Sequence, residues 1–173
     1  MINKYLDISK TNYIGTFSLS GQNDILIFDC SKNKINKIVE IPENLINLNC
    51  SINQIVQLDN LNNSLEILNC KGNKLIELSN LPNKLSKLDC SYNCISSLDF
   101  LPDSLVELDC GYNDLTNLDN LPFGLKILRC ESNKIVNLNN LPKFLEELDY
   151  SSNPLKKIKT DKSNLKIINE LSA

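Results

Sequence analysis

Residues 85–104 read LSKLDCSYNCISSLDFLPDS, and the segments on either side repeat this arrangement of leucine, cysteine, asparagine and proline. Cysteine occurs at positions 30, 50, 70, 90, 110 and 130, and asparagine at 33, 53, 73, 93, 113, 133 and 153. Proline occurs at 42, 82, 102, 122 and 142, with Asn62 in the one gap. Segments starting at 25, 45, 65, 85, 105, 125 and 145 therefore share the pattern LxxLxCxxNxLxxLxxLPxx. Such self-similarity indicates a solenoid in which each repeat is one turn of the chain.

The pattern LxxLxCxxNxL resembles the leucine-rich repeat, and the LP after it resembles the short bacterial class of that repeat, 20 residues long. The resemblance covers residues 25–171. The abundance of Asn, Ile and Lys also makes the chain similar to the leucine-rich repeat proteins of amoeba-infecting giant viruses. The family resemblance implies an α/β-class horseshoe or superhelix. Its parallel β-sheet would line the concave face, with extended or 3₁₀ segments and little regular α-helix on the convex face.

The residues predict the same fold on physical grounds. Within each repeat, the fourth-place Leu and the sixth-place Cys alternate with polar residues, as on a half-buried strand. Parallel strands of successive turns can stack about 4.8 Å apart. The rest of each repeat must turn twice and return, which leaves little room for a helix. Proline also biases the residue before it toward an extended conformation.

We expect one domain with three parts. Residues 1–24 fit the repeat poorly, but the alternating runs YLDIS and GTFSLS predict an N-terminal strand cap. Residues 25–164 form seven repeats, and residues 165–173 form a C-terminal partial repeat or cap with a final strand. Tyr150 and Asp161 replace the usual cysteine and leucine, which is typical of capping turns.

The charge and the chain start exclude several function classes. The chain has 18 basic and 21 acidic residues, a net charge of −3, and no histidine. With this net charge we expect no general attraction of the protein to nucleic acid. Histidine, the commonest general base and metal ligand, is missing. The sequence contains no apolar run of about 18 residues, so we expect no membrane span. The start of the chain lacks a secretory signal pattern. We therefore expect an intracellular protein, in the cytoplasm or in a host cytoplasm if it is viral or effector-derived.

The six periodic cysteines could be metal ligands, a disulfide series or core. Metal sites usually place ligands in close pairs, and parallel strands hold neighbouring Cβ atoms farther apart than a disulfide allows. We predict that these thiols fill the core, where a small soft side chain packs well. Cys94 is one place beyond the periodic asparagine and is expected near the surface. There the thiol is either an inert surface group or one that reacts or links two copies of the chain. We predict no metal site and no cofactor.

The periodic asparagines have a structural interpretation. A buried amide must satisfy its donors and its acceptor. At the turn after each strand, it can bond backbone groups of its own turn and of the neighbouring turn. We predict an asparagine ladder of this kind and no catalytic role for it.

The family resemblance places the third, fifth and seventh residues of each repeat on the concave face. These places contain seven acidic and three basic residues, so 3 − 7 gives a net charge of −4, against −3 for the whole chain. The eighth place adds Tyr92 beside Tyr112, and tyrosines are common binding anchors. We predict a partner-binding site on this face, composed of Asp89, Tyr92, Glu107, Asp109, Tyr112, Arg129, Glu131 and Asp149.

We expect a non-catalytic module that binds a protein with a basic or mixed-charge surface, as a monomer or with weak self-association. The family resemblance implies protein recognition. Some bacterial relatives join such repeats to a ubiquitin ligase, but these 173 residues leave no segment for one. The alternative is a structural or self-associating scaffold, such as a particle component. A glycan is an alternative ligand to a protein partner. The lysines at 156, 157, 159, 162 and 166 are interpreted as solubilising the open end rather than binding nucleic acid or membrane.

Overall fold

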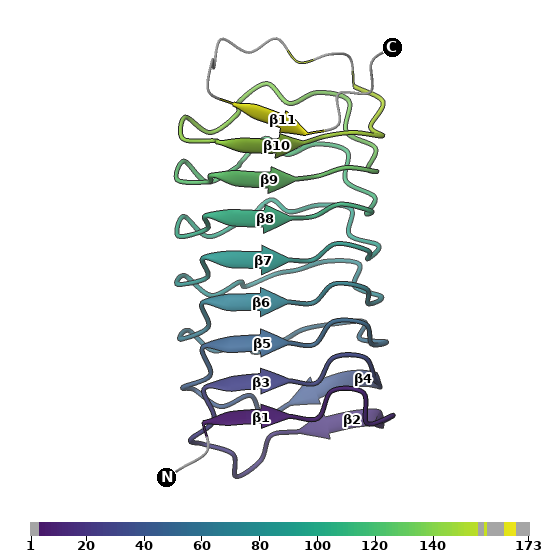
Figure 1. The fold of residues 1–173 in the computed structure, drawn as a ribbon, viewed down its shortest axis with the longest axis vertical. Coiled ribbons are helices and arrows are strands. Elements are labelled where there is room, and N and C mark those ends of the chain that lie inside the picture. Colours follow the sequence, from purple (N-terminus) through teal and green to yellow (C-terminus); the bar gives the residue numbers. More distant parts are fainter. Residues whose placement is uncertain (1–3, 156–157, 159–164, 169–173) are drawn as a thin grey trace.

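The computed structural model describes residues 4–155, 158 and 165–168, and in it the chain winds into an elongated solenoid (Figure 1). One strand from each turn joins a nine-stranded parallel sheet in the order β1-β3-β5-β6-β7-β8-β9-β10-β11. The bounds are Tyr5–Asp7 (β1), Ile27–Asp29 (β3), Asn47–Asn49 (β5), Ile67–Asn69 (β6), Lys87–Asp89 (β7), Glu107–Asp109 (β8), Ile127–Arg129 (β9), Glu147–Asp149 (β10) and Lys166–Ile168 (β11). The predicted repeat solenoid with a parallel sheet is confirmed.

The strands pair so that equivalent places of successive repeats form columns. Leu88 pairs with Leu108, and Asp89 pairs with Asp109 in the same register. Because side chains alternate between the two faces of a strand, the fourth place of every repeat points into the solenoid. The third and fifth places on either side of it point outward.

The core is a continuous column of apolar side chains. In the central turn Leu105, Leu108, Cys110 and Leu115 are all fully buried. Burying one leucine side chain contributes about 1.5–3 kcal/mol relative to exposure, and a single turn could not bury this set alone. All six periodic cysteines are free thiols in this core, as predicted, and Cys94 is exposed.

The asparagine ladder runs along the turn that follows the strands. Its Nδ2 atoms donate to the carbonyl of the sixth-place residue of their own turn and to a carbonyl of the preceding turn. For Asn113 these acceptors are Cys110 at 3.1 Å and Cys90 at 3.0 Å. Its Oδ1 atoms accept a backbone N–H from the preceding turn, which for Asn113 is that of Ile95 at 2.9 Å. The predicted bonding between turns is confirmed, and the amides tie each turn to its neighbour.

The eighth place of each repeat has a left-handed backbone. Its φ lies between 53° and 64° at Lys32, Ile52, Gly72, Tyr92, Tyr112, Ser132 and Ser152. This conformation costs a residue with a Cβ atom about 1–2 kcal/mol, so the surrounding turn must impose it. The imposed turn also brings successive eighth-place side chains into one column.

The convex side contains extended and turn segments. Strand β4 (Lys34–Val39) pairs in parallel with β2 (Ile14–Ser18) to form a separate two-stranded sheet, seen behind β1 and β3 in Figure 1. The described residues contain no α-helix and no 3₁₀ segment, so of the two kinds of convex segment that were expected the structure has the extended one. They therefore include no helix long and apolar enough to span a bilayer.

The two ends of the solenoid extend the sheet. β1 pairs with β3 in a slightly longer turn, since Tyr5 is opposite Ile27, a step of 22 residues. At the other end β11 pairs with β10 in parallel. Asp161 and four of the five clustered lysines, at 156, 157, 159 and 162, lie outside the described residues.

Candidate partner-binding face

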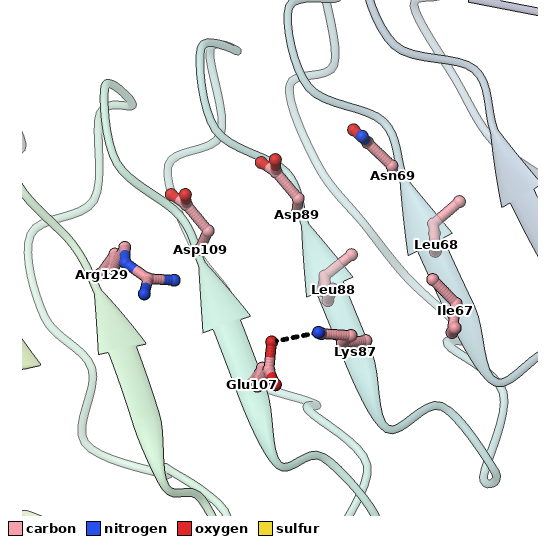
Figure 2. A pocket seen from close by; sticks show the side chains of 9 residues that line it. All are labelled: Ile67, Leu68, Asn69, Lys87, Leu88, Asp89, Glu107, Asp109 and Arg129. Carbon is pink, nitrogen blue, oxygen red and sulfur yellow. Dashed lines mark ion pairs between the residues drawn. The ribbon is translucent and has the colours of Figure 1, made fainter. Parts of the chain in front are cut away.

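A groove of about 250 Å³ opens on the outer face of strands β6 to β9 (Figure 2). Its walls are mainly third-place and fifth-place side chains, because strand alternation turns these places away from the core. The groove is lined by Ile67, Leu68, Asn69, Lys87, Leu88, Asp89, Glu107, Asp109 and Arg129.

Four of the eight predicted site residues line this groove: Asp89, Glu107, Asp109 and Arg129. Ile67, Asn69 and Lys87 also line it but were not among the predicted residues. They belong to the third-place and fifth-place rows, so the register of the repeat contained the signal. Their apolar and basic character makes the groove more mixed than an acidic surface.

The cations of the groove are paired with acids on neighbouring strands. Lys87 Nζ lies 2.7 Å from Glu107 Oε2, the contact drawn in Figure 2, and Arg129 forms an ion pair with Glu147. Such partly exposed pairs contribute only about 0–1 kcal/mol each to stability. They do neutralise the charge of these residues locally, which leaves the two remaining groove acids as the main negative groups.

Those two acids are Asp89 and Asp109, which lie opposite each other on β7 and β8 and point the same way in Figure 2. Burial raises the pKa of Asp109, and the neighbouring carboxylate of Asp89 raises it further. Like charges on adjacent strands destabilise a sheet. A cation placed between them would relieve both effects.

The fifth-place side chain also closes the end of its strand. Asp89 Oδ1 accepts the backbone N–H of Ser91 at 3.1 Å and its hydroxyl at 2.6 Å, and Asp109 accepts an equivalent backbone bond. Asn49 and Asn69 accept the same backbone bond in their own turns. This hydrogen bond gives the fifth-place side chain a structural role, but it requires only an oxygen acceptor and not a negative charge.

Tyr92 and Tyr112 form a stacked pair beside the groove. Their ring centroids lie 4.1 Å apart with an interplanar angle of 11°, and the residues are 47% and 42% exposed. Lys71 Nζ lies 5.0 Å from the centroid of the Tyr92 ring, within the range of a cation–π contact. The side-chain hydrogen bond with Tyr112 raises the pKa of Tyr92 above its ordinary value.

Glu131 folds back over the glycine of the preceding turn. A Cβ atom at Gly111 would lie 2.5 Å from Glu131 Oε1, so only glycine leaves room for this carboxylate. The buried Oε2 atom of Glu131 has no hydrogen-bond partner in the part of the chain that the structure describes. Burial raises the pKa of Glu131, and Asp109 and Asp149 raise it further.

The seventh place offers little exposed surface. Ser31, Ser51 and Ser91 are buried there, whereas Lys71, Glu131 and Ser151 are partly exposed. The buried serines can contribute little to a partner-binding surface, and the projection of the whole row onto the concave face stays a prediction.

Asp149 is the predicted site residue least available to a partner. It is 7% exposed and accepts both the backbone N–H of Ser151 at 3.0 Å and its hydroxyl at 2.8 Å. Its place in the strand is the one expected, but its carboxylate is occupied within its own turn.

Among the described residues, no group of three or more cysteine, aspartate or glutamate side chains is arranged to hold a metal ion. The core thiols are also in a poor environment for such chemistry. Burial raises the pKa of Cys50 to about 12, and it raises the pKa of Cys70 and Cys110 as well. Protonated thiols are weak ligands and weak nucleophiles.

Comparison with solved structures identifies the fold family. YopM from Yersinia enterocolitica WA-314 matches with a TM-score of 0.82 and 36% sequence identity, over 88% of this chain and 34% of that one. YopM from Yersinia pestis, described as a leucine-rich effector protein, has a TM-score of 0.74 and 28% identity, over 84% and 48%. The functional domain of InlJ from Listeria monocytogenes, which includes a cysteine ladder, has a TM-score of 0.68 and 29% identity, over 90% and 41%.

This chain is a leucine-rich repeat solenoid. Its repeats are of the bacterial effector type, as the resemblance implied. InlJ is described as including a cysteine ladder, and the six periodic cysteines of this chain form a buried series along its solenoid. The chain spans between a third and half of the length of these related structures.

No protein-family model matches the leucine-rich repeat sequence, and a search of curated proteins gave no significant match. The similarity to giant-virus proteins was not tested by these comparisons and stays a prediction.

Proposed function

We propose that this leucine-rich repeat chain is a non-catalytic module that binds a protein partner through the face around the β6–β9 groove. The observation that carries the proposal is the exposed Tyr92–Tyr112 stack beside the acids Asp89 and Asp109. Exposed aromatic anchors next to a concave polar surface are typical of protein interfaces. The relatives with the same fold include a leucine-rich effector protein, which supports an interaction role.

The charges favour a partner with a basic or mixed-charge surface. Lys87 and Arg129 already have acidic partners, whereas Asp89 and Asp109 lie side by side on adjacent strands. A basic partner would gain from approach to this pair, mostly through a faster association rate. The same charges disfavour nucleic acid and anionic membranes as ligands. We propose that the interaction takes place inside a cell, with the chain as a monomer or weakly self-associated.

A pull-down experiment tests the proposal. The wild-type chain is compared with a face variant, Asp89→Asn/Asp109→Asn/Tyr112→Ser, in lysate from candidate host cells. The asparagines keep the strand-closing bond that Asn49 and Asn69 make, so they remove charge and preserve the turn. A matched control, Glu77→Gln/Asp119→Asn, removes two exposed charges outside the strands.

A partner recovered by the wild type and the control but lost by the face variant would support binding through this face. Equal recovery by all three proteins, or no partner at all, would refute it and favour the structural or self-associating scaffold. Circular dichroism of each protein first establishes that the three fold alike. A partner that is lost after glycan removal from the lysate would instead indicate a glycan ligand.

A further inference from the structure

The tyrosine stack beside the groove already holds one cation of the chain itself. Lys71 Nζ lies 5.0 Å from the centroid of the Tyr92 ring, and Tyr112 covers the other face of that ring at 4.1 Å. Lys71 can reach this position because the eighth place of its own turn is Gly72, which has no side chain to cover Tyr92. One end of the two-ring stack is therefore closed by an ammonium group.

Among the residues that the structure describes, no cation–π contact is found on Tyr112 at the other end of the stack. In the next turn the eighth place is Ser132, whose short side chain is too small to cover an aromatic ring. That turn is bonded to the backbone of Tyr112, whose N–H donates to the carbonyl of Glu131 at 2.8 Å. Tyr112 is 42% exposed, so part of its side chain is open to a ligand.

The charge around this open end is negative. Glu131 has a buried Oε2 atom that no described residue bonds, and its carboxylate lies over Gly111 next to Tyr112. Asp109 is close enough to both Glu131 and Tyr92 to affect their pKa values. Two cations of the turn that contains Glu131 are already paired, Arg129 with Glu147 and Lys134 with Asp114. An incoming cation would meet an aromatic face and two carboxylates.

We propose that the outer face of Tyr112, between Ser132 and the carboxylates of Asp109 and Glu131, is the seat for an arginine side chain of the protein partner. This proposal rests on the proposed function and specifies the partner chemistry that the face recognises. The guanidinium group would repeat on Tyr112 the contact that Lys71 makes on Tyr92. Arginine fits better than lysine because its flat guanidinium group stacks on an aromatic ring while its N–H groups bond a carboxylate.

The test uses the full chain, labelled with ¹⁵N, and follows backbone amide shifts during titration with three capped tripeptides. The probes are acetyl-Gly-Arg-Gly-amide, its lysine analogue and its citrulline analogue, which keeps the shape of arginine but has no charge. We expect saturable shifts centred on Tyr92, Tyr112 and Glu131 with the arginine probe. The lysine probe should bind more weakly, and the citrulline probe about tenfold more weakly or not at all.

Two variants separate the seat from general attraction to an acidic surface. Tyr92→Ser/Tyr112→Ser removes both rings, because the loss of Tyr112 alone would uncover the stacked face of Tyr92, and it should weaken arginine binding about tenfold. Lys71→Ser places at the seventh place the residue that Ser51 and Ser91 supply in neighbouring turns, and it should strengthen binding because the second ring face becomes open. General attraction would also strengthen binding to Lys71→Ser but would leave binding by Tyr92→Ser/Tyr112→Ser unchanged.

Absence of saturable shifts, equal binding of arginine and citrulline, equal binding of arginine and lysine, or unchanged binding by Tyr92→Ser/Tyr112→Ser would each overturn the arginine seat. These failures are distinct from failure of the proposed function. A partner that the face variant loses in the pull-down, together with no arginine binding, would keep the partner-binding face and reject this ligand chemistry.

Discussion

Replacement of Asn113 by alanine tests how the asparagine ladder holds the turns together. The residue is 8% exposed. Its Oδ1 atom accepts the backbone N–H of Ile95 at 2.9 Å, and its Nδ2 atom donates to the carbonyls of Cys90 at 3.0 Å, Cys110 at 3.1 Å and Gly111 at 3.2 Å. Alanine removes all four contacts and leaves the four backbone groups in place. Because an amide NH₂ has two hydrogens, its three contacts count as two hydrogen bonds.

These groups are not affected equally. The carbonyl of Cys90 still accepts a bond from Asn93 at 3.0 Å, that of Cys110 one from Asn133 at 3.0 Å, and that of Gly111 one from the backbone of Tyr92 at 2.9 Å. Only the N–H of Ile95 loses its acceptor while buried. An unsatisfied buried donor costs about 1–3 kcal/mol and each other lost bond about 1 kcal/mol, so the free energy of unfolding should fall by about 3–5 kcal/mol. That is a large fraction of the stability of a typical domain.

Urea unfolding followed by circular dichroism measures this change. The control is Asn117→Ala, since Asn117 is exposed and makes no side-chain hydrogen bond in the described structure. A loss of less than about 1 kcal/mol at Asn113, or a loss equal to that of the control, would refute the role of the ladder in joining the turns.

Three further predictions concern stability, pH and reactivity. Ile52 has a φ of 55°, which is unfavourable for a β-branched residue, so Ile52→Asn should raise the free energy of unfolding by about 0.5–1 kcal/mol; a lower urea midpoint would contradict this strain. Burial and Asp89 raise the pKa of Asp109 above its ordinary value of 3.8, so the native state binds this proton more readily than the unfolded state. The protonation of Asp109 therefore stabilises the folded state below pH 3.8, and this stabilisation is lost as the pH rises through the pKa of the folded state. Asp109→Asn should therefore gain stability relative to the wild type as pH rises from about 3.5 to about 7, and parallel stability curves would refute the shift. A thiol-reactive disulfide reagent should modify one of the seven cysteines, Cys94, in the native protein and all seven in denaturant, because the other six are buried; a native count above one would show that the cysteine core opens.

The sequence by itself determined the fold and its interior. The 20-residue period, the alternation of Leu88 and Cys90 with polar residues, and the fixed asparagine at Asn93 predict the strand, the core and the ladder. This is possible because each turn packs only on its neighbours, so a local pattern repeated in phase specifies the whole solenoid. The same register also placed Asp89 and Asp109 on one face.

The tertiary structure alone decided what that face presents. The strand-closing bonds of Asp89, the burial of Asp149 and the position of Glu131 over Gly111 depend on side-chain conformations that the repeat pattern does not contain. The left-handed backbone of the eighth place, which stacks Tyr92 on the tyrosine of the next turn, cannot be read from the sequence pattern either. The physical reason is that the pattern encodes which side of the strand a residue occupies, whereas exposure and contact on the outer face depend on the lengths and charges of side chains in adjacent turns.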